Sequence, residues 1–326
     1  MKKILFSGIQ PTGELHLGNY LGALKQWVKL QDQYQSIFSV VDYHSLTENF
    51  DPQTKRQQIL TTAAEILAVG IDPKKSILFV QSEVSAHAEL SWILNCLTPM
   101  GELERMTQYK DKSLRQKENI NAGLFTYPIL MAADILLYKT SVVPVGEDQL
   151  QHLELARTLA RRFNQKFGQY FPEPQALVSS GKRIMALNAP DKKMSKSLVN
   201  SYIALSDRPE VIRKKIQSAV TDLGGQGKNQ VSGGRNLLNL LNEFCGDQKI
   251  ITKFEADYKK GTLKYSELKP VLAEEIIKTL APIQAQRAVY LKSPEKLLKI
   301  LAAGAKQAHL IADKNFKEIK KLIGLI

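Results

Sequence analysis

The chain has 326 residues, of which 44% are hydrophobic and 24% charged, and this composition excludes an intrinsically disordered protein. No stretch approaches the roughly 18 apolar residues that a membrane helix needs, and the start MKKILFSGIQ is too polar for a signal peptide. We therefore expect a soluble, cytoplasmic protein with no membrane partner. The two cysteines, Cys96 and Cys245, are far apart, so neither a disulfide framework nor a zinc site is expected.

The net charge of +13 is typical of a protein that binds a polyanion. Lysine outnumbers arginine roughly three to one, however, and such a bias also arises without any particular partner. The charge supports a nucleic-acid partner only together with other evidence.

Short apolar runs alternate with helical patterns through the first half of the chain. The runs predict strands at residues 4–6, 37–41, 77–80 and 142–145. Apolar positions recur at helical spacing from Leu17 to Val28 and from Leu150 to Phe163. This alternation predicts an α/β fold with a doubly wound parallel sheet, in which ligands bind at the carboxyl ends of the strands.

From about residue 190 the strand-like runs end and helical patterns dominate. Helix start signals occur at Pro209 and Pro294, and the polar, Gly-rich stretch at residues 222–234 is expected to form a loop. We predict two domains, residues 1–187 and 188–326, of which the second is all-helical.

Two common phosphate-binding motifs are missing. The dinucleotide pattern G-x-G-x-x-G does not follow the first strand, and the nearest Walker-type sequence has Asn229 where Ser or Thr must bind magnesium. A nicotinamide dehydrogenase and a P-loop ATPase are therefore disfavoured.

The first predicted strand leads instead into a turn that opens the first amphipathic helix. His16 and Asn19 are three positions apart and share a face of its first turn, and Gly18 lets a phosphate approach the backbone. Helix amino ends attract phosphate. The alternative is an ordinary helix start capped by His16.

A lysine-rich strip at residues 193–197 lies close to the predicted domain boundary. Its lysines and hydroxyls suit a loop that closes over a triphosphate and stabilises the leaving pyrophosphate. The alternative is a solvated Lys-rich linker.

These two segments resemble the two signature motifs of class I aminoacyl-tRNA synthetases. Residues 16–19 read His-Leu-Gly-Asn and residues 193–197 read Lys-Met-Ser-Lys-Ser. Through residues 6–13, 101–108, 131–138 and 143–149 the resemblance extends to bacterial-type tryptophanyl-tRNA synthetases and covers nearly the whole chain. Asn19, where a second His is common, and Leu198, where an acidic residue is expected, depart from the class pattern.

The resemblance implies a Rossmann-like catalytic domain at residues 1–187 and a helical domain at 188–326 that binds the tRNA anticodon. It implies that the C-terminal helix packs back on the first domain. The implied reaction joins L-tryptophan to AMP and then to tRNA, with ATP as substrate, Mg²⁺ bound through the ATP phosphates and no dedicated metal site. A homodimer is also implied, and the apolar region at residues 92–106 is a candidate interface.

The resemblance also implies roles for individual residues. The catalytic set is Gln10, His16, Asn19, Lys193 and Lys196. The ATP-binding set is Gln10, Pro11, Thr12, Gly18, Asn19, Gly146, Glu147, Asp148, Ile184, Lys193, Met194, Ser195, Lys196 and Ser197. The tryptophan-binding set is Phe6, Tyr127, Met131, Asp134, Val143 and Gln149.

Asp134 stands out on physical grounds as well. Residues 127–138 begin with Tyr127-Pro128, suited to a first helical turn, and are apolar almost all round, so this carboxylate is expected to be buried and to need a donor. Tyr127, Met131 and Asp134 fall on one helical face, which suits an indole with its single N–H. Alternatives are a lysine or arginine partner for Asp134, and a tyrosine-specific relative.

The remaining polar residues at strand ends and the other histidines receive weaker interpretations. Asp42, His44 and Gln81 are possible pocket lining, whereas His87, His152 and His309 are expected to be surface or capping residues. Rival functions are a small-molecule nucleotidylyltransferase, which needs no lysine strip, and an RNA-binding relative that has lost its chemistry.

Overall fold

The computed structural model describes residues 2–107, 120–178, 184–196, 198, 200–222 and 232–326. The chain forms two compact units, each drawn from separate segments. The first contains Met1–Gly13, Trp27–Ser179 and Tyr290–Ile326, and the second contains Glu14–Gln26 and Ser180–Val289. The predicted assignment of catalysis to residues 1–187 and of tRNA binding to 188–326 stays a prediction.

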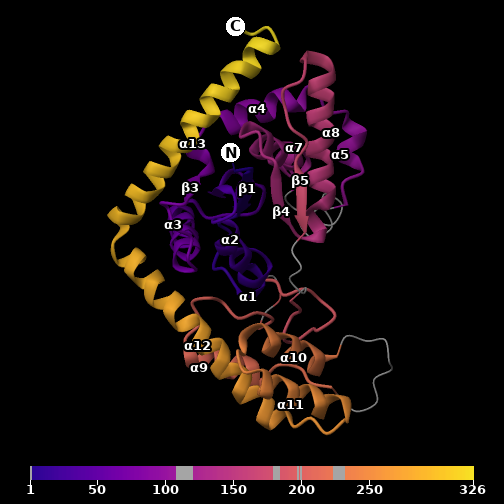
Figure 1. Ribbon diagram of the computed structural model, residues 1–326, viewed down its shortest axis with the longest axis vertical. Coiled ribbons are helices and arrows are strands. Elements are labelled where there is room, and N and C mark those ends of the chain that lie inside the picture. Colours follow the sequence, from indigo (N-terminus) through magenta and orange to yellow (C-terminus); the bar gives the residue numbers. More distant parts are fainter. Residues whose placement is uncertain (1, 108–119, 179–183, 197, 199, 223–231) are drawn as a thin grey trace. The chain divides into compact units, whose positions relative to one another are not determined.

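The first unit is built around a parallel sheet of five strands in the order β3-β2-β1-β4-β5 (Figure 1). The strands are β1 (Ile4–Ile9), β2 (Gln35–Val40), β3 (Ser76–Val80), β4 (Val142–Val145) and β5 (Gln175–Val178). The α/β prediction and its four strands are confirmed, while β5 is an additional edge strand. Strand order reverses between β1 and β4, which is where ligands bind in such sheets.

Helices surround the sheet and make up most of the second unit. Those of the first unit are α3 (Pro52–Ala68), α4 (Ala86–Asn95), α5 (Met100–Glu104), α7 (Ala122–Leu137), α8 (Leu150–Phe167) and α13 (Pro294–Leu322). The second unit contains α1 (Leu17–Asn19), the π-helical turn η1 (Tyr20–Leu24), α9 (Pro209–Gln217), α10 (Gly233–Phe244) and α11 (Gln248–Lys259). Helices α2 (Lys25–Leu30) and α12 (Tyr265–Lys292) contain the boundaries between units.

The predicted helix starts at Pro209 and Pro294 are confirmed. The predicted loop at residues 222–234 ends earlier than expected, because Gly233 and Gly234 already belong to α10 and the Ser232 side chain caps that helix by accepting from Arg235 N. Residues 223–231 lie outside the described part of the chain.

Helix α7 begins earlier than its sequence suggested. The Asn121 side chain caps it by accepting from Leu124 N at 2.9 Å, so Pro128 lies inside the helix and not in its first turn. The expectation of burial holds, since most α7 residues, including Asp134, are buried. The helix therefore starts at its capping residue, Asn121, and Pro128 does not mark its first turn.

The C-terminal helix α13 packs against the edge strand β3 of the same unit (Figure 1). Gly304 permits this packing, because a Cβ on it would lie 1.9 Å from the Leu78 carbonyl oxygen. Further along the helix, Asn315 Nδ2 donates to Leu137 O at 2.8 Å. The helix thereby covers backbone of β3 that no neighbouring strand covers.

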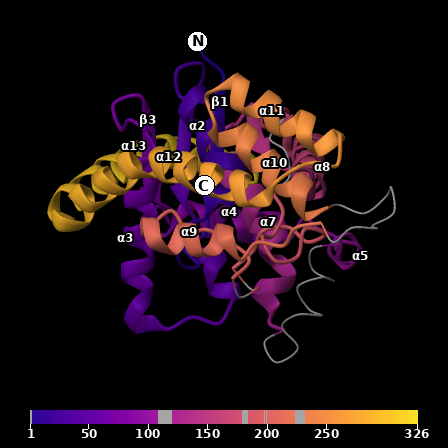
Figure 2. The ribbon, with the colours of Figure 1, turned by 90° about the horizontal axis from the view of Figure 1, so that it is seen from below.

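In the second unit α10 and α11 lie side by side in both views (Figure 2). Arg235 of α10 donates two parallel hydrogen bonds to the Glu255 carboxylate of α11, at 2.7 and 2.9 Å. Asn236 Nδ2 donates to Ala186 O at 3.2 Å and so ties α10 to the segment before the lysine strip.

No helix in the described part of the chain combines the length and the apolar character that crossing a membrane requires.

Substitution Gly304→Ala is expected to destabilise the protein. Alanine favours a helix over glycine by about 1 kcal/mol, but the collision with the Leu78 carbonyl forces a backbone shift that costs about 1–3 kcal/mol or more. We expect a lower midpoint of urea unfolding. Gly246→Ala is the control, because nothing lies within 4 Å of the added Cβ; an unchanged midpoint for Gly304→Ala would contradict the packing described.

Candidate active site

The turn at His16 and the lysine strip lie in the same unit and are connected by backbone pairing. Leu17 N donates to Ile203 O at 3.0 Å and Leu205 N donates to Leu15 O at 2.8 Å, so His16 forms an antiparallel bridge with Ala204. Residues 203–205 closely follow the strip in sequence. This pairing brings the two predicted signature segments into one site.

His16 is held in one orientation by its own helix start. Its Nδ1 accepts from Gly18 N at 3.0 Å, and its backbone N donates to Asn19 Oδ1 at 3.1 Å. Because Nδ1 accepts a hydrogen bond, the neutral ring carries its proton on Nε2. The amide oxygen of Asn19 is used in this cap, and its NH₂ group keeps the donors that a phosphate would need.

Electrostatics keep this ring neutral. Burial and the nearby charges of Lys196 and Lys193 lower the pKa of His16 from 6.5 to about 4. A neutral imidazole with Nε2–H is a hydrogen-bond donor at neutral pH that adds no positive charge to a site already holding two lysines. The structure thus supports a donor role for His16 and disfavours general-base catalysis by Nε2.

The lysine strip is presented by a short backbone ladder. Met194 N donates to Ile184 O at 2.9 Å, Lys193 bridges Met185, and Ser201 Oγ donates to Ser195 O at 2.7 Å. The Met194 and Ile184 side chains are buried, Lys193 is exposed, and Lys196 is partly exposed. Gly18 faces Met194, since a Cβ on Gly18 would lie 3.7 Å from Met194 Cβ. Ser197 lies outside the described residues.

In the first unit Asp134 is 2% exposed and sits at the centre of a polar cluster. His44 Nε2 lies 2.7 Å from Oδ2, while Gln81 Nε2 at 2.7 Å and His87 Nδ1 at 2.6 Å reach Oδ1. The donors of Asp134 within the described residues are therefore two histidines and an amide, not the lysine or arginine considered above.

Burial and the two neighbouring histidines have opposing effects on the ionisation of this carboxyl group. Burial raises the pKa of Asp134, but the charge and hydrogen bond of His44 and the hydrogen bond of His87 outweigh it, so the pKa falls from 3.8 to about 2. Asp134 is therefore a carboxylate at neutral pH, and an acceptor only.

The other predicted tryptophan-binding residues of α7, β1 and β4 are buried or partly buried in the same unit. Tyr127 is buried, and its ring meets the His44 ring edge-on at 6.3 Å, so Tyr127 and Asp134 do share a face. Phe6 of β1 is buried against Tyr138, with ring centroids 5.6 Å apart and nearly parallel planes. Val143 of β4 is buried and Met131 is partly buried.

The predictions for two histidines are wrong. His87 is fully buried on α4, and His152 is 1% exposed, with Nε2 2.9 Å from Tyr127 Oη. Helical spacing could have found them: His87 precedes Leu90 and Leu94 on one apolar face, and His152 shares a face with Ala156 and Leu159. His309 is exposed, as expected.

The strand-end residues treated only as possible lining have definite contacts. His44 and Gln81 bind Asp134, and Gln81 Oε1 also accepts from Tyr43 N at 3.2 Å. Asp42 Oδ1 accepts from Tyr43 N and Ser82 N, which joins the ends of β2 and β3.

The segments that follow β1 and β4 are more open. Gln10 and Thr12 are partly buried, Pro11 is buried, and Gly13 has a φ of 104° that favours glycine. After β4, Gly146 leads into a short 3₁₀ turn in which Glu147 and Asp148 are exposed and Gln149 Nε2 donates to Asp148 Oδ2 at 3.4 Å. The ATP and tryptophan roles of these residues stay predictions.

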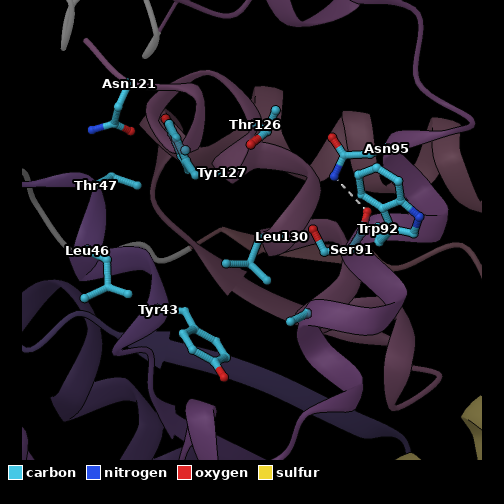
Figure 3. A pocket seen from close by; sticks show the side chains of 12 residues that line it. Tyr43, Leu46, Thr47, Ser91, Trp92, Asn95, Asn121, Thr126, Tyr127 and Leu130 are labelled. Carbon is cyan, nitrogen blue, oxygen red and sulfur yellow. Dashed lines mark hydrogen bonds between the residues drawn. The ribbon is translucent and has the colours of Figure 1, made fainter. Parts of the chain in front are cut away.

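A pocket of about 360 Å³ opens beside Tyr127, between α4, α7 and residues 43–47 (Figure 3). Tyr127 lines it together with Leu46, Ser91, Trp92 and Asn121, whereas Asp134 is not among the lining residues. Asn95 Nδ2 donates to Ser91 O at 2.8 Å on its wall (Figure 3). Among the described residues, no group of three or more His, Cys, Asp or Glu side chains is placed to hold a metal ion.

Comparison with known proteins gives consistent results. The family model described as tRNA synthetases class I (W and Y) matches residues 2–281. A tryptophan–tRNA ligase of Listeria monocytogenes is 50% identical, over 100% of this chain and 98% of its own length. The tryptophanyl-tRNA synthetase structure from Mycoplasma pneumoniae is 38% identical with a TM-score of 0.89, and it covers 99% of this chain and 98% of that one.

A third relative was solved with ligands. It is tryptophanyl-tRNA synthetase from Campylobacter jejuni complexed with ADP and tryptophan, 36% identical with a TM-score of 0.86, covering 99% of both chains. With the His16 turn and the lysine strip in one site and a family model matched over most of the sequence, the chain belongs to the class I tRNA synthetases, in the family of the tryptophan and tyrosine enzymes.

Proposed function

We propose that this protein is a tryptophan–tRNA ligase that activates L-tryptophan with ATP and then transfers it to tRNA. The observation that carries the proposal is full-length identity of 46–50% to bacterial tryptophan–tRNA ligases, rather than to tyrosine enzymes. The geometry around His16 and Asp134 agrees with it, since it offers a phosphate-binding segment and a buried acceptor for one N–H.

The first step forms a bond between a carboxylate oxygen of tryptophan and the α-phosphorus of ATP. The bond from that phosphorus to the β-phosphate bridging oxygen breaks, and pyrophosphate leaves with the electron pair. In the second step a ribose hydroxyl at the tRNA 3′ end attacks the carbonyl carbon, the bond from that carbon to the phosphate oxygen breaks, and AMP leaves with the electron pair while the hydroxyl proton passes to solvent. Both steps need positioning and charge stabilisation and no protein nucleophile.

On the ATP side, we assign donors to His16 Nε2–H, to the Asn19 amide and to Lys193 and Lys196, with Gln10 completing the set. Negative charge builds on the leaving pyrophosphate, so lysines brought to it stabilise the transition state more than the ground state. ATP arrives as its Mg²⁺ complex, because Mg²⁺ favours phosphate oxygens and water over a dedicated protein cage. We also assign nucleotide binding to Pro11, Thr12, Gly18, Ile184, Met194, Ser195, Ser197 and residues 146–148.

On the amino acid side, we assign the indole N–H to the Asp134 carboxylate, with Tyr127, Met131, Phe6 and Val143 as apolar walls and Gln149 near the amino acid backbone. The rivals fit less well. A small-molecule nucleotidylyltransferase has no need of the lysine strip, and an RNA-binding relative without chemistry has no need of a buried, ionised Asp134. A cytoplasmic location stays a prediction.

ATP–pyrophosphate exchange, measured with each standard amino acid, tests the function. We expect rapid exchange with tryptophan and far slower exchange with tyrosine and the rest, followed by tryptophan-dependent charging of tRNA. Exchange that is fastest with another amino acid would refute the proposed specificity.

Substitution Lys196→Ala is expected to slow tryptophan-dependent exchange by about tenfold or more, because one preorganised positive donor to the pyrophosphate is lost. It should also raise the pKa of His16 above about 4, since the Lys196 charge helps to lower it. Ring-proton NMR shifts of His16 report that pKa, and Lys192→Ala, which removes the lysine just before the strip, is the matched control.

The pH dependence follows from the same shift. The pKa of His16 in the folded protein lies below its value of 6.5 in the unfolded chain, so the unfolded chain takes up this proton first. Its contribution to stability is therefore full above pH 6.5 and declines as the pH falls toward 4. Near-normal exchange and an unmoved His16 titration in Lys196→Ala would contradict both roles.

We further propose that the protein is a homodimer joined through the region at residues 92–106. Trp92 is 71% exposed and Met100 is 63% exposed, so both apolar side chains are accessible to a second copy of the chain, and Trp92 borders the pocket in Figure 3.

Light scattering should give twice the chain mass, and Trp92→Glu should shift the protein toward the monomer, because burying an unpaired carboxylate in an interface is costly. Leu310→Glu, which alters a side chain that is 67% exposed on α13, should leave the dimer intact. A monomeric parent protein would exclude the interface.

A further inference from the structure

Behind Asp134 lies a second pair of buried polar side chains to which the proposed mechanism gives no role. His87 of α4 is fully buried and lies between Asp134 and Tyr138, with Nδ1 2.6 Å from Asp134 Oδ1 and Nε2 2.8 Å from Tyr138 Oη. Tyr138, which ends α7, is also fully buried. The three groups form one hydrogen-bonded chain.

The carboxylate of Asp134 has two oxygens with about four acceptor positions in all. Gln81 Nε2 and His87 Nδ1 occupy both positions of Oδ1, and His44 Nε2 occupies one position of Oδ2. Among the described donors, this distribution leaves one acceptor position, on Oδ2. An indole ring has one N–H and no acceptor, so a single open position matches it.

The direction of each hydrogen bond follows from the ionised carboxylate. Asp134 can only accept, so His87 Nδ1 carries a proton. With a neutral ring, Nε2 accepts and Tyr138 Oη–H donates to it. Burial and the negative charge of Asp134 raise the pKa of Tyr138 well above 10, so its hydroxyl keeps its proton. The tyrosine thus satisfies the buried Nε2 of His87 while Nδ1 binds Asp134.

Aromatic packing fixes Tyr138 independently of its hydroxyl. Its ring stacks on Phe6 with centroids 5.6 Å apart and meets Phe79 edge-on at 6.1 Å. Substitution Tyr138→Phe therefore removes one hydroxyl and leaves the ring and its neighbours in place. The hydroxyl can be tested separately from the fold.

We propose that His87 and Tyr138 are positioning residues for amino acid specificity: together they saturate Oδ1 and hold Asp134 with Oδ2 turned toward the N–H of the tryptophan side chain. This inference rests on the proposed function, because it assigns the ligand of Asp134. His87 and Tyr138 touch neither substrate directly, and they act through the orientation of one carboxylate.

The test compares tryptophan with its benzothiophene analogue, in which sulfur replaces the indole N–H. Loss of one hydrogen bond in the chain should raise the KM for tryptophan in Tyr138→Phe by about threefold to tenfold, with little change in kcat or in the KM for ATP. For the analogue the same substitution should change KM by less than about twofold, because no N–H remains to be oriented. Equal changes for both ligands would overturn the proposal and leave only a packing role.

Tyr170→Phe is the matched control. It also removes one tyrosine hydroxyl in the first unit, one that donates to Asn315 O at 2.9 Å, and it should not discriminate between the two ligands. Thermal unfolding confirms that each variant is folded. A second substitution, His87→Asn, retains an amide donor near the position of Nδ1 and should be milder than His87→Leu.

Nitrogen NMR of labelled histidine gives a readout that packing alone would not move. His87 Nδ1 should stay protonated in both proteins, because Asp134 is unchanged, and loss of the hydroxyl in Tyr138→Phe should shift the Nε2 resonance of His87. An unchanged Nε2 resonance in the variant would refute the role of Tyr138. If the parent protein does not exchange with tryptophan at all, both the proposed function and this inference fail. If the parent protein exchanges normally but Tyr138→Phe affects tryptophan and the benzothiophene analogue equally, only this inference fails.

Discussion

The first unit depends on one buried negative charge. Four separate segments send a donor or a supporting group to Asp134: residues 43–47 through His44, the turn after β3 through Gln81, α4 through His87 and the end of α7 through Tyr138. Removing one partner from a buried charge typically costs about 3–5 kcal/mol of folding free energy. The side chains that contact Asp134 therefore hold their segments in fixed positions around it. In the proposed function, the same network that satisfies the carboxylate also decides which of its lone pairs faces tryptophan.

The second unit, by contrast, holds positively charged side chains that are not buried. His16 is fixed by its cap and stays neutral, Lys193 remains exposed, and the buried Met194 anchors the strip between them. A neutral imidazole beside Lys193 and Lys196 adds no third positive charge to this part of the unit.

The sequence predicted the parallel sheet and the two signature segments because both depend on local patterns: apolar runs for the strands, and fixed spacing for residues 16–19 and 193–197. It missed β5, a strand of four residues whose apolar run is short and of which only Leu177 is partly buried. It also misjudged His87 and His152. A histidine on an apolar helical face is buried when the partner that satisfies it, here Asp134 or Tyr127, comes from elsewhere in the chain.

The packing of α13 on β3 has a consequence for synthesis of the protein. β3 is an edge strand, and edge strands with free backbone groups can pair with other chains. The helix that covers Leu78 begins more than 200 residues later in sequence, so this contact cannot form until nearly the whole chain has left the ribosome. During that interval the outer side of β3 is uncovered, and it is the part of the nascent sheet most open to pairing with another chain.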